Sequence, residues 1–226
     1  MPPKKDSEMN SNYYTGGSKS QQRKQLILGL GSLELVCSEH QIDQLLKYLD
    51  MLERWNKAYN LTAIRDPLDM IHLHLLDSLA ISTELEGDDF IDVGTGPGLP
   101  GIPLAILNQE KKFTLLDSNG KKTRFLFQVK LELGLDNISE VNKRVEEFHP
   151  QMAYDCVLSR AFSSLGDMVE NCQHLLNQNG YFLAMKGKLP QTELSELPKN
   201  YKVEKLHLIN VPGVEGQRHL IKIVKT

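Results

Sequence analysis

The chain has 226 residues, of which 40% are apolar and 24% are charged, and its formal net charge is −3. This balance is typical of a globular chain, and it excludes a protein that binds nucleic acid through a basic charge over its whole surface. No apolar run approaches the ~20 residues of a membrane span, and Cys37, Cys156 and Cys172 match no disulfide or zinc spacing. We therefore expect a cytoplasmic protein with reduced cysteines, no metal site and no membrane partner.

The beginning of the chain divides into a polar stretch and a helical region. Residues 1–22 are rich in Ser, Asn, Gly, Lys and Gln, which predicts a disordered tail. Residues 23–86 carry apolar residues at helical spacing and predict a small N-terminal helical lobe. Within it, Ser38 and Gln41 have the spacing of a capping box, and Asp66 before a proline is typical of a helix N-cap. We expect this lobe to pack over one edge of a sheet.

Residues 87–226 alternate between strand and helix patterns. The expected strands cover 90–93, 112–116, 137–141, 154–158, 181–185, 201–211 and 219–224, and the expected helices cover 102–107, 121–133, 165–176 and 193–197. Such alternation predicts an α/β domain with a Rossmann-like, mostly parallel sheet of seven strands. The last two strands are joined by a turn long enough for a hairpin, so we expect an antiparallel end to the sheet.

A glycine-rich turn follows the first of these strands, between Phe90 and Gly101. Strand, glycine turn and helix in succession bring backbone close to a nucleotide-like ligand, because a Cβ would block the turn or the ligand. The best frame for the pattern is Asp92-x-Gly94-x-Gly96-x-Gly98, with an acidic residue at the strand end. Asp92 can accept a hydrogen bond from a ligand's amino group, which favours S-adenosylmethionine, since that ligand combines an adenosine with an amino-acid end.

A second cofactor fits the same glycines. Gly96, Gly98 and Gly101 match the dinucleotide pattern G-x-G-x-x-G, but that pattern begins at the strand end, and here two residues intervene. Asp117 ends the next strand, where a carboxylate accepts from a ribose hydroxyl in both kinds of site. The segment 144–148 follows the third strand, where adenine-contacting residues belong. These residues support an adenosine ligand without choosing between the two cofactors.

Several segments together closely resemble one family, the small-subunit (16S) ribosomal RNA guanine-N7 methyltransferases, also called glucose-inhibited division protein B. The resemblance covers roughly residues 38–226. It rests on Phe90 to Gly101 with Ile102-Pro103-Leu104, Thr114-Leu115-Leu116-Asp117-Ser118, Arg144-Val145-Glu146-Glu147-Phe148, Ser159-Arg160-Ala161-Phe162, Lys186-Gly187, Trp55-Asn56-Lys57-Ala58-Tyr59-Asn60-Leu61-Thr62, His74-Leu75-Leu76-Asp77-Ser78 and Arg218-His219-Leu220.

This resemblance implies a class I methyltransferase fold that uses S-adenosylmethionine. It implies cofactor contacts at Gly94, Leu99, Val145, Glu146 and Arg160, and a 16S ribosomal RNA, 30S subunit or assembly particle as the substrate. Guanine N7 already carries a lone pair, so the reaction is expected to be a direct in-line attack that needs no catalytic base. The sequence does not determine the oligomeric state, and a monomer is the default expectation.

Three residues near the expected acceptor position are candidates for orienting the guanine. Arg160 or Lys186 could donate to guanine O6 and leave N7 free, and Phe162 could stack on the base. RNA attachment is expected to depend on local cations, so that binding weakens as salt rises. The candidate cations are Arg54, Lys57, Arg65, Lys121, Lys122, Arg124, Lys186, Lys188 and Arg218.

Three alternative functions remain open from the sequence. The main one is a class I methyltransferase that acts on a small molecule or a protein, since its glycine turn and Asp117 would look the same. A nicotinamide-dependent oxidoreductase is disfavoured by the glycine frame. A non-catalytic RNA-binding module is disfavoured by the intact turn, because a lost site would tolerate bulkier residues there.

Overall fold

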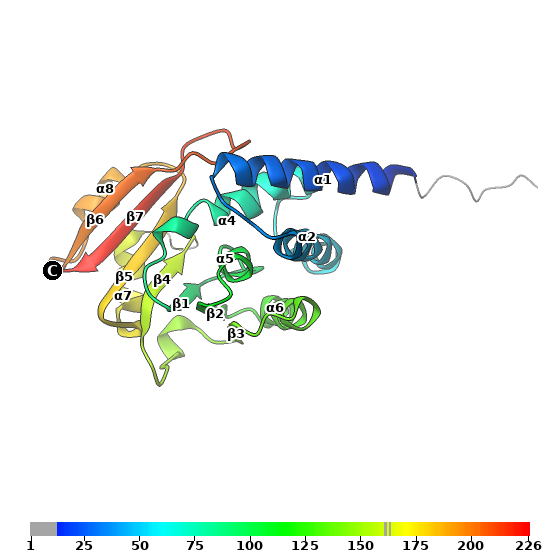
Figure 1. Cartoon of the computed structure of the whole chain (residues 1–226). Coiled ribbons are helices and arrows are strands. Elements are labelled where there is room, and N and C mark those ends of the chain that lie inside the picture. The colour runs from blue at the N-terminus through cyan, green and yellow to red at the C-terminus, as the bar shows by residue number, and fades with distance from the viewer. Residues whose placement is uncertain (1–12, 161, 163) are drawn as a thin grey trace, which may run out of the picture.

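The computed structural model describes residues 13–160, 162 and 164–226, with only the backbone for residues 13–18. In this part of the chain the core is a seven-stranded sheet in the order β3-β2-β1-β4-β5-β7-β6 (Figure 1). Strands β1 to β5 run parallel, and β7 is antiparallel to both β5 and β6. The strands are β1 Asp89–Val93, β2 Lys112–Leu116, β3 Ile138–Val141, β4 Tyr154–Ser159, β5 Leu176–Lys186, β6 Tyr201–Leu208 and β7 His219–Lys225. The predicted Rossmann-like sheet with an antiparallel hairpin is confirmed.

Both faces of the sheet are covered, which explains why its strands read as apolar runs. Successive residues of a strand point to opposite faces. Phe90 and Leu183 therefore join the apolar cluster under α5 (Gly101–Leu107) and α6 (Gly120–Leu133). Ile91 and Phe182 join the cluster under α7 (Leu165–Cys172) on the other face. Short helices η3 (Val145–Glu147), η4 (Gln173–Leu175) and α8 (Gln191–Ser195) complete this domain.

The residues before β1 form the expected helical lobe. Its elements are α1 Tyr13–Ser32, α2 Glu39–Tyr59, α3 Pro67–Met70, the π-helical turn η1 Ile71–Leu76, α4 Asp77–Leu79 and η2 Ser82–Glu84. The capping box at Ser38 and the N-cap at Asp66 are both present. The lobe packs on α5 and α6 through one continuous apolar cluster. No helix among the described residues is both long and apolar enough to cross a membrane.

The predicted tail of residues 1–22 is wrong over residues 13–22, because α1 begins at Tyr13; residues 1–12 lie outside the described part. Tertiary contacts explain the difference. The side chain of Arg23 pairs with Asp43 and Glu39 of α2, and Lys19 Nζ lies 2.6 Å from Asp50 Oδ2. Further along α1, Leu26 is fully buried. Packing of this kind stabilises a helix even where the intrinsic helix propensity of its residues is weak. Composition reflects only the propensity and not the packing.

The predicted helix over 165–176 ends early. Helix α7 stops at Cys172, a short 3₁₀ turn follows, and Leu176 already belongs to β5, where it pairs with Tyr154. The stretch before Gly180, which lies between the predicted helix and the predicted strand over 181–185, is thus the beginning of an eleven-residue strand. Pairing with β4 supplies the backbone partners that local sequence does not reveal.

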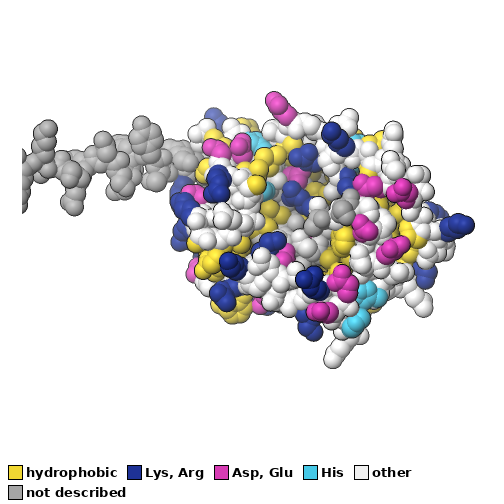
Figure 2. Space-filling model, turned by 180° about the vertical axis from the view of Figure 1, so that it is seen from behind, with side chains coloured by type: hydrophobic (Ala, Val, Ile, Leu, Met, Phe, Trp, Pro, Cys, Tyr) yellow, Lys and Arg dark blue, Asp and Glu magenta, His cyan; other side chains and the backbone are white. Residues whose placement is uncertain are grey.

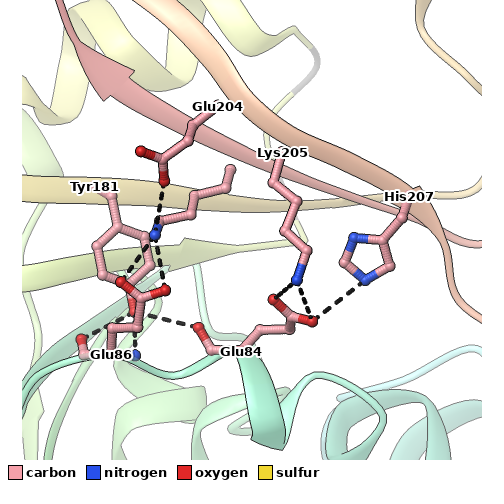
Figure 3. Close-up of polar contacts among 7 residues, drawn as sticks. Glu84, Glu86, Tyr181, Glu204, Lys205 and His207 are labelled. Atoms are coloured by element: carbon pink, nitrogen blue, oxygen red, sulfur yellow. Dashed lines mark hydrogen bonds and ion pairs between the residues drawn. The ribbon is translucent and has the colours of Figure 1, made fainter.

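A group of ion pairs fastens the segment before β1 to the C-terminal hairpin (Figure 3). Lys205 Nζ lies 2.6 Å from Glu84 Oε2, and Lys222 Nζ lies 2.9 Å from Glu86 Oε1. The phenol oxygen of Tyr181 accepts from the backbone N–H of Glu86 at 2.7 Å. Glu84 ends η2, the last element of the lobe, and Glu86 lies between η2 and β1, so these contacts fix the end of the lobe relative to β5, β6 and β7.

Candidate functional site

A pocket of about 330 Å³ lies at the carboxyl ends of β1 and β2. In parallel α/β sheets this is the edge where ligands bind. Its lining combines apolar walls with polar groups: Val93, Gly94, Leu116, Asp117, Ser118, Lys122, Lys143, Arg144, Val145, Glu146 and Phe162. Four of the predicted cofactor residues (Gly94, Asp117, Val145 and Glu146) thus meet at one pocket, together with the predicted acceptor residue Phe162.

The turn after β1 needs its glycines for different reasons. Gly94, Gly96 and Gly98 all have positive φ, of 68°, 62° and 101°. A Cβ on Gly98 would lie 2.3 Å from Ile102 Cγ1, so this glycine lets the turn pack against α5. A Cβ on Gly96 would meet nothing within 4 Å, so Gly96 leaves open space above the turn. Leu99 is buried in the core of the domain, and its predicted cofactor contact stays a prediction.

Asp92 lies near the end of β1, directly before the turn, and is fully buried. Its Oδ2 accepts from the Thr95 hydroxyl at 2.7 Å and from the Gly101 N–H at 2.9 Å. Burial raises the pKa of Asp92 to about 6, against the lowering effect of those hydrogen bonds and of the nearby Arg160 charge. Its Oδ1 is buried with no hydrogen-bond partner in the described residues. The carboxylate therefore holds the turn together, and its predicted contact with a ligand stays a prediction.

Asp117 connects the turn to β2 and lines the pocket. Its Oδ2 accepts from the Gly96 N–H at 2.9 Å and lies 3.2 Å from Lys122 Nζ, while Oδ1 accepts from the Asn119 N–H at 2.9 Å. The side chain is largely buried. These donors fix the carboxylate at the pocket wall, where a sugar hydroxyl could add a further donor.

The three predicted acceptor residues occupy different places. Phe162 lines the pocket. Lys186 Nζ donates to the Phe162 carbonyl at 3.1 Å and lies 2.9 Å from Glu193 Oε2, so it holds the segment that carries Phe162. Arg160 is outside the pocket lining and pairs with buried Asp77 of the lobe, its Nη2 lying 3.0 Å from Asp77 Oδ2.

Sequence reasoning named no role for Asp77 or Glu193. Asp77 forms ion pairs with residues far away in the sequence, and Glu193 pairs with Lys186 at the end of β5. The local spacing of residues indicates neither kind of pair. Asp77 did stand inside a family-specific motif, which was the one available sign. In the described parts of the chain, no three His, Cys, Asp or Glu side chains converge on a point that could hold a metal ion.

Comparison with known proteins decides the family. A family model described as "GidB: rRNA small subunit methyltransferase G" matches residues 41–221. The chain belongs to this family. A curated member from Saccharophagus degradans is 57% identical over 192 residues, which is 85% of this chain and 86% of that protein. A second member, from Escherichia fergusonii, is 54% identical over 186 residues, covering 82% of this chain and 90% of that protein.

Solved structures show the same fold at much lower identity. The structure of TrmN from Thermus thermophilus matches 77% of this chain and 53% of its own, with a TM-score of 0.54 and 17% identity. The structure of M. jannaschii TYW2 in complex with AdoMet matches 66% of this chain and 75% of its own, with a TM-score of 0.53 and 14% identity. The resemblance and the class I fold are thus confirmed, and the TYW2 structure was solved with AdoMet, the cofactor expected for this chain.

Proposed function

We propose that this chain transfers the methyl group of S-adenosylmethionine to N7 of a guanine in small-subunit (16S) ribosomal RNA. The observation that carries the proposal is the pocket at the carboxyl ends of β1 and β2, in a chain that belongs to the methyltransferase G family. The relatives are named for action on small-subunit rRNA, which supports the RNA substrate. The N7 position is the one that the family resemblance implies, and the in-line attack is our inference from the free lone pair on that nitrogen.

The residues of the pocket fit an adenosine-bearing cofactor. Asp117 and Glu146 offer carboxylate oxygens for sugar hydroxyls, and Val145 and Phe162 offer apolar walls for a purine. Gly96 keeps free the space that a Cβ would fill. When bound, S-adenosylmethionine supplies a methyl group on a positively charged sulfur.

The chemistry of the acceptor atom explains why the reaction needs no catalytic base. Guanine N7 uses its own lone pair to form the new carbon–nitrogen bond, so no side chain has to remove a proton. The protein's task is therefore to orient the base and to exclude water, which accounts for a large part of many rate accelerations.

The residues that we expect to orient the base lie in the segment after β4 or contact it. Phe162 offers a ring that could stack on the base, a contact worth about 1–3 kcal/mol in single-stranded RNA. Lys186 holds the Phe162 carbonyl, so it sets where that ring lies. Arg160 carries a guanidinium that can donate to guanine O6, which would leave N7 free.

Figure 2 shows how charge is distributed on the face opposite to that of Figure 1: Lys and Arg side chains are interspersed with Asp and Glu. This pattern agrees with the net charge of −3 and with RNA binding through local cations.

The test is a methyl-transfer assay with labelled S-adenosylmethionine on naked 16S RNA and on 30S particles, followed by mapping of the modified base. We expect label on guanine N7. Label at another atom, or on a protein or small molecule only, would refute the proposal and favour the alternative of a methyltransferase with a different acceptor. Comparing the two RNA substrates shows whether an assembled particle is required.

A further inference from the structure

Three segments that are far apart in the chain meet at the carboxylate of Asp77. Asp77 begins α4 of the lobe and is only 2% exposed. Its Oδ2 lies 3.0 Å from Nη2 of Arg160, at the end of β4, and its Oδ1 lies 2.9 Å from Nε of Arg218, just before β7. Each of the three residues belongs to a different one of the motifs that resemble the family. The motifs of Asp77 and Arg218 contribute no residue to the lining of the cofactor pocket.

The charges of this cluster do not balance. One buried carboxylate faces two guanidinium groups, so a positive charge remains. The Arg160 and Arg218 side chains are 28% and 25% exposed, so water screens part of this charge, but a buried donor atom without a hydrogen-bond partner is still costly. The Nη1 atom of Arg160 is buried and has no hydrogen-bond partner among the described residues. It is therefore a buried donor whose hydrogen bond none of the described residues completes.

The position of Arg160 places that donor beside the cofactor site. Its charge acts on the carboxyl of Asp92, which lies near the end of β1 and accepts hydrogen bonds from Thr95 and Gly101. It acts in the same way on Tyr48 of α2, whose hydroxyl donates to the Pro97 carbonyl of the turn at 3.0 Å. The Arg160 side chain thus contacts the lobe through Asp77, and it follows β4, which pairs in parallel with β1, so it lies at the same edge of the sheet as the glycine turn.

The backbone next to Asp77 reinforces the arrangement. The preceding six residues, Ile71–Leu76, form a π-helical turn, a feature that is rare and often found at functional sites. Within it, the Leu73 carbonyl lies 3.5 Å from Arg160 Nη2. The lobe therefore presents both a carboxylate and a carbonyl to the same nitrogen, which leaves Nη1 for a different partner.

We propose that Asp77 is a positioning residue of the methyltransferase site, which holds the Arg160 guanidinium so that Nη1 donates to an oxygen of the bound cofactor or of the acceptor base. This inference rests on the proposed function for the identity of the acceptor base. It gives the helical lobe a second task beside packing, because the lobe supplies the carboxylate that orients a side chain of the other domain.

The first measurement is the Kd for S-adenosylmethionine by calorimetry, with no RNA present. The variants are Asp77→Asn, Arg160→Gln and the double variant, with Asp69→Asn as a control, because Asp69 is an exposed carboxylate of the same lobe. If the oxygen belongs to the cofactor, both single variants weaken binding about tenfold, the size expected for a hydrogen bond to a charged group. The double variant should then be no weaker than Arg160→Gln alone, since Asp77 acts through Arg160.

The second measurement is methyl transfer to 30S particles. If the oxygen belongs to the base, the Kd for S-adenosylmethionine is unchanged, and KM for the particles rises by a similar factor in both single variants. Wild-type values of both Kd and KM in Asp77→Asn would overturn the inference, and so would effects that multiply in the double variant. Absence of guanine N7 methylation by the wild-type protein would instead overturn the proposed function, and the calorimetric comparison would still test Asp77.

Asp77→Asn removes one partner of a buried ion pair, so its fold is checked by thermal melting. Asp77→Glu keeps the charge and moves it by one methylene, and it decides the question where Asp77→Asn does not fold. We expect Asp77→Glu to melt close to the wild type and to weaken the affected constant about threefold or more. An unchanged Kd and KM in a folded Asp77→Glu would overturn the inference.

Discussion

The Thr95 hydroxyl donates to the buried carboxylate of Asp92 at 2.7 Å, inside the turn that follows β1. The pKa of Asp92 is raised from its ordinary value of 3.8 to about 6, first of all by burial. A carboxyl with a raised pKa binds its proton more tightly in the folded state than in the unfolded state. Its contribution to stability is therefore fully present below pH ~4 and is lost as the pH rises through ~6.

We predict that Asp92→Asn flattens this part of the pH dependence. The amide that replaces the carboxyl cannot ionise, so the variant should lose less stability than the wild type between pH ~4 and ~6.5, by on the order of 3 kcal/mol. The measurement is urea unfolding at a series of pH values, and the quantity compared is the difference between variant and wild type. Asp88→Asn, at an exposed carboxylate, serves as the control and should follow the wild-type curve. Parallel curves for wild type and Asp92→Asn would contradict the prediction.

The glycine turn shows how far the site could be predicted. Its frame predicted a ligand site after β1, and Gly94 and Asp117 do line a pocket there. The individual roles of Asp92 and Gly98 did not follow from the pattern, because only the packing shows that both face the interior. A motif identifies where backbone approaches a ligand, whereas the direction of each side chain depends on neighbours from other elements.

A second prediction concerns two effects of a side chain at Gly96, namely strain in the backbone and loss of the space that a ligand would occupy. Gly96→Val should abolish measurable binding of S-adenosylmethionine, because the side chain would enter the open space above the turn. The matched control is Gly134→Val, at the C-cap of α6. Gly134 has φ of 63° and also nothing within 4 Å of a Cβ. Both variants should lose about 1–2 kcal/mol of stability from the left-handed backbone. Calorimetry should show wild-type affinity for Gly134→Val only, and equal affinity in both variants would exclude Gly96 from the site.

A third prediction concerns RNA. Lys121 and Arg124 lie in the first turns of α6, beside the pocket residue Lys122, and both are exposed with no ion pair among the described residues. If each contacts a phosphate, Lys121→Gln and Arg124→Gln should each reduce the slope of log Kobs against log salt by about 0.7. Filter binding of labelled 16S RNA at several salt concentrations measures that slope. Lys225→Gln, at the far end of β7, is the control and should leave the slope unchanged. Binding that does not depend on salt would remove the electrostatic part of the proposal.

The sheet was predictable from sequence, whereas α1 was predicted as helical only from residue 23 onward. Strand limits such as Lys112–Leu116 follow from short apolar runs that are buried on both faces. By contrast, α1 has few apolar residues, two of which, Leu26 and Leu30, are buried against the rest of the lobe. Arg23 adds ion pairs to α2 that no local pattern indicates. Helices stabilised by tertiary contacts rather than by propensity escape a reading of local sequence.

A fourth prediction tests whether α1 is an integral part of the lobe. Leu26 is fully buried, whereas Leu28, two residues further along the same helix, is 55% exposed. Leu26→Ala should lower the free energy of unfolding by about 2–5 kcal/mol, since it removes buried methyl groups and leaves a cavity. Leu28→Ala, the same substitution on the solvent side, should change it by less than about 0.5 kcal/mol. Urea unfolding of the full chain measures both. Equal, small effects would show that α1 does not contribute to the folded core, and the predicted tail would then extend through this helix.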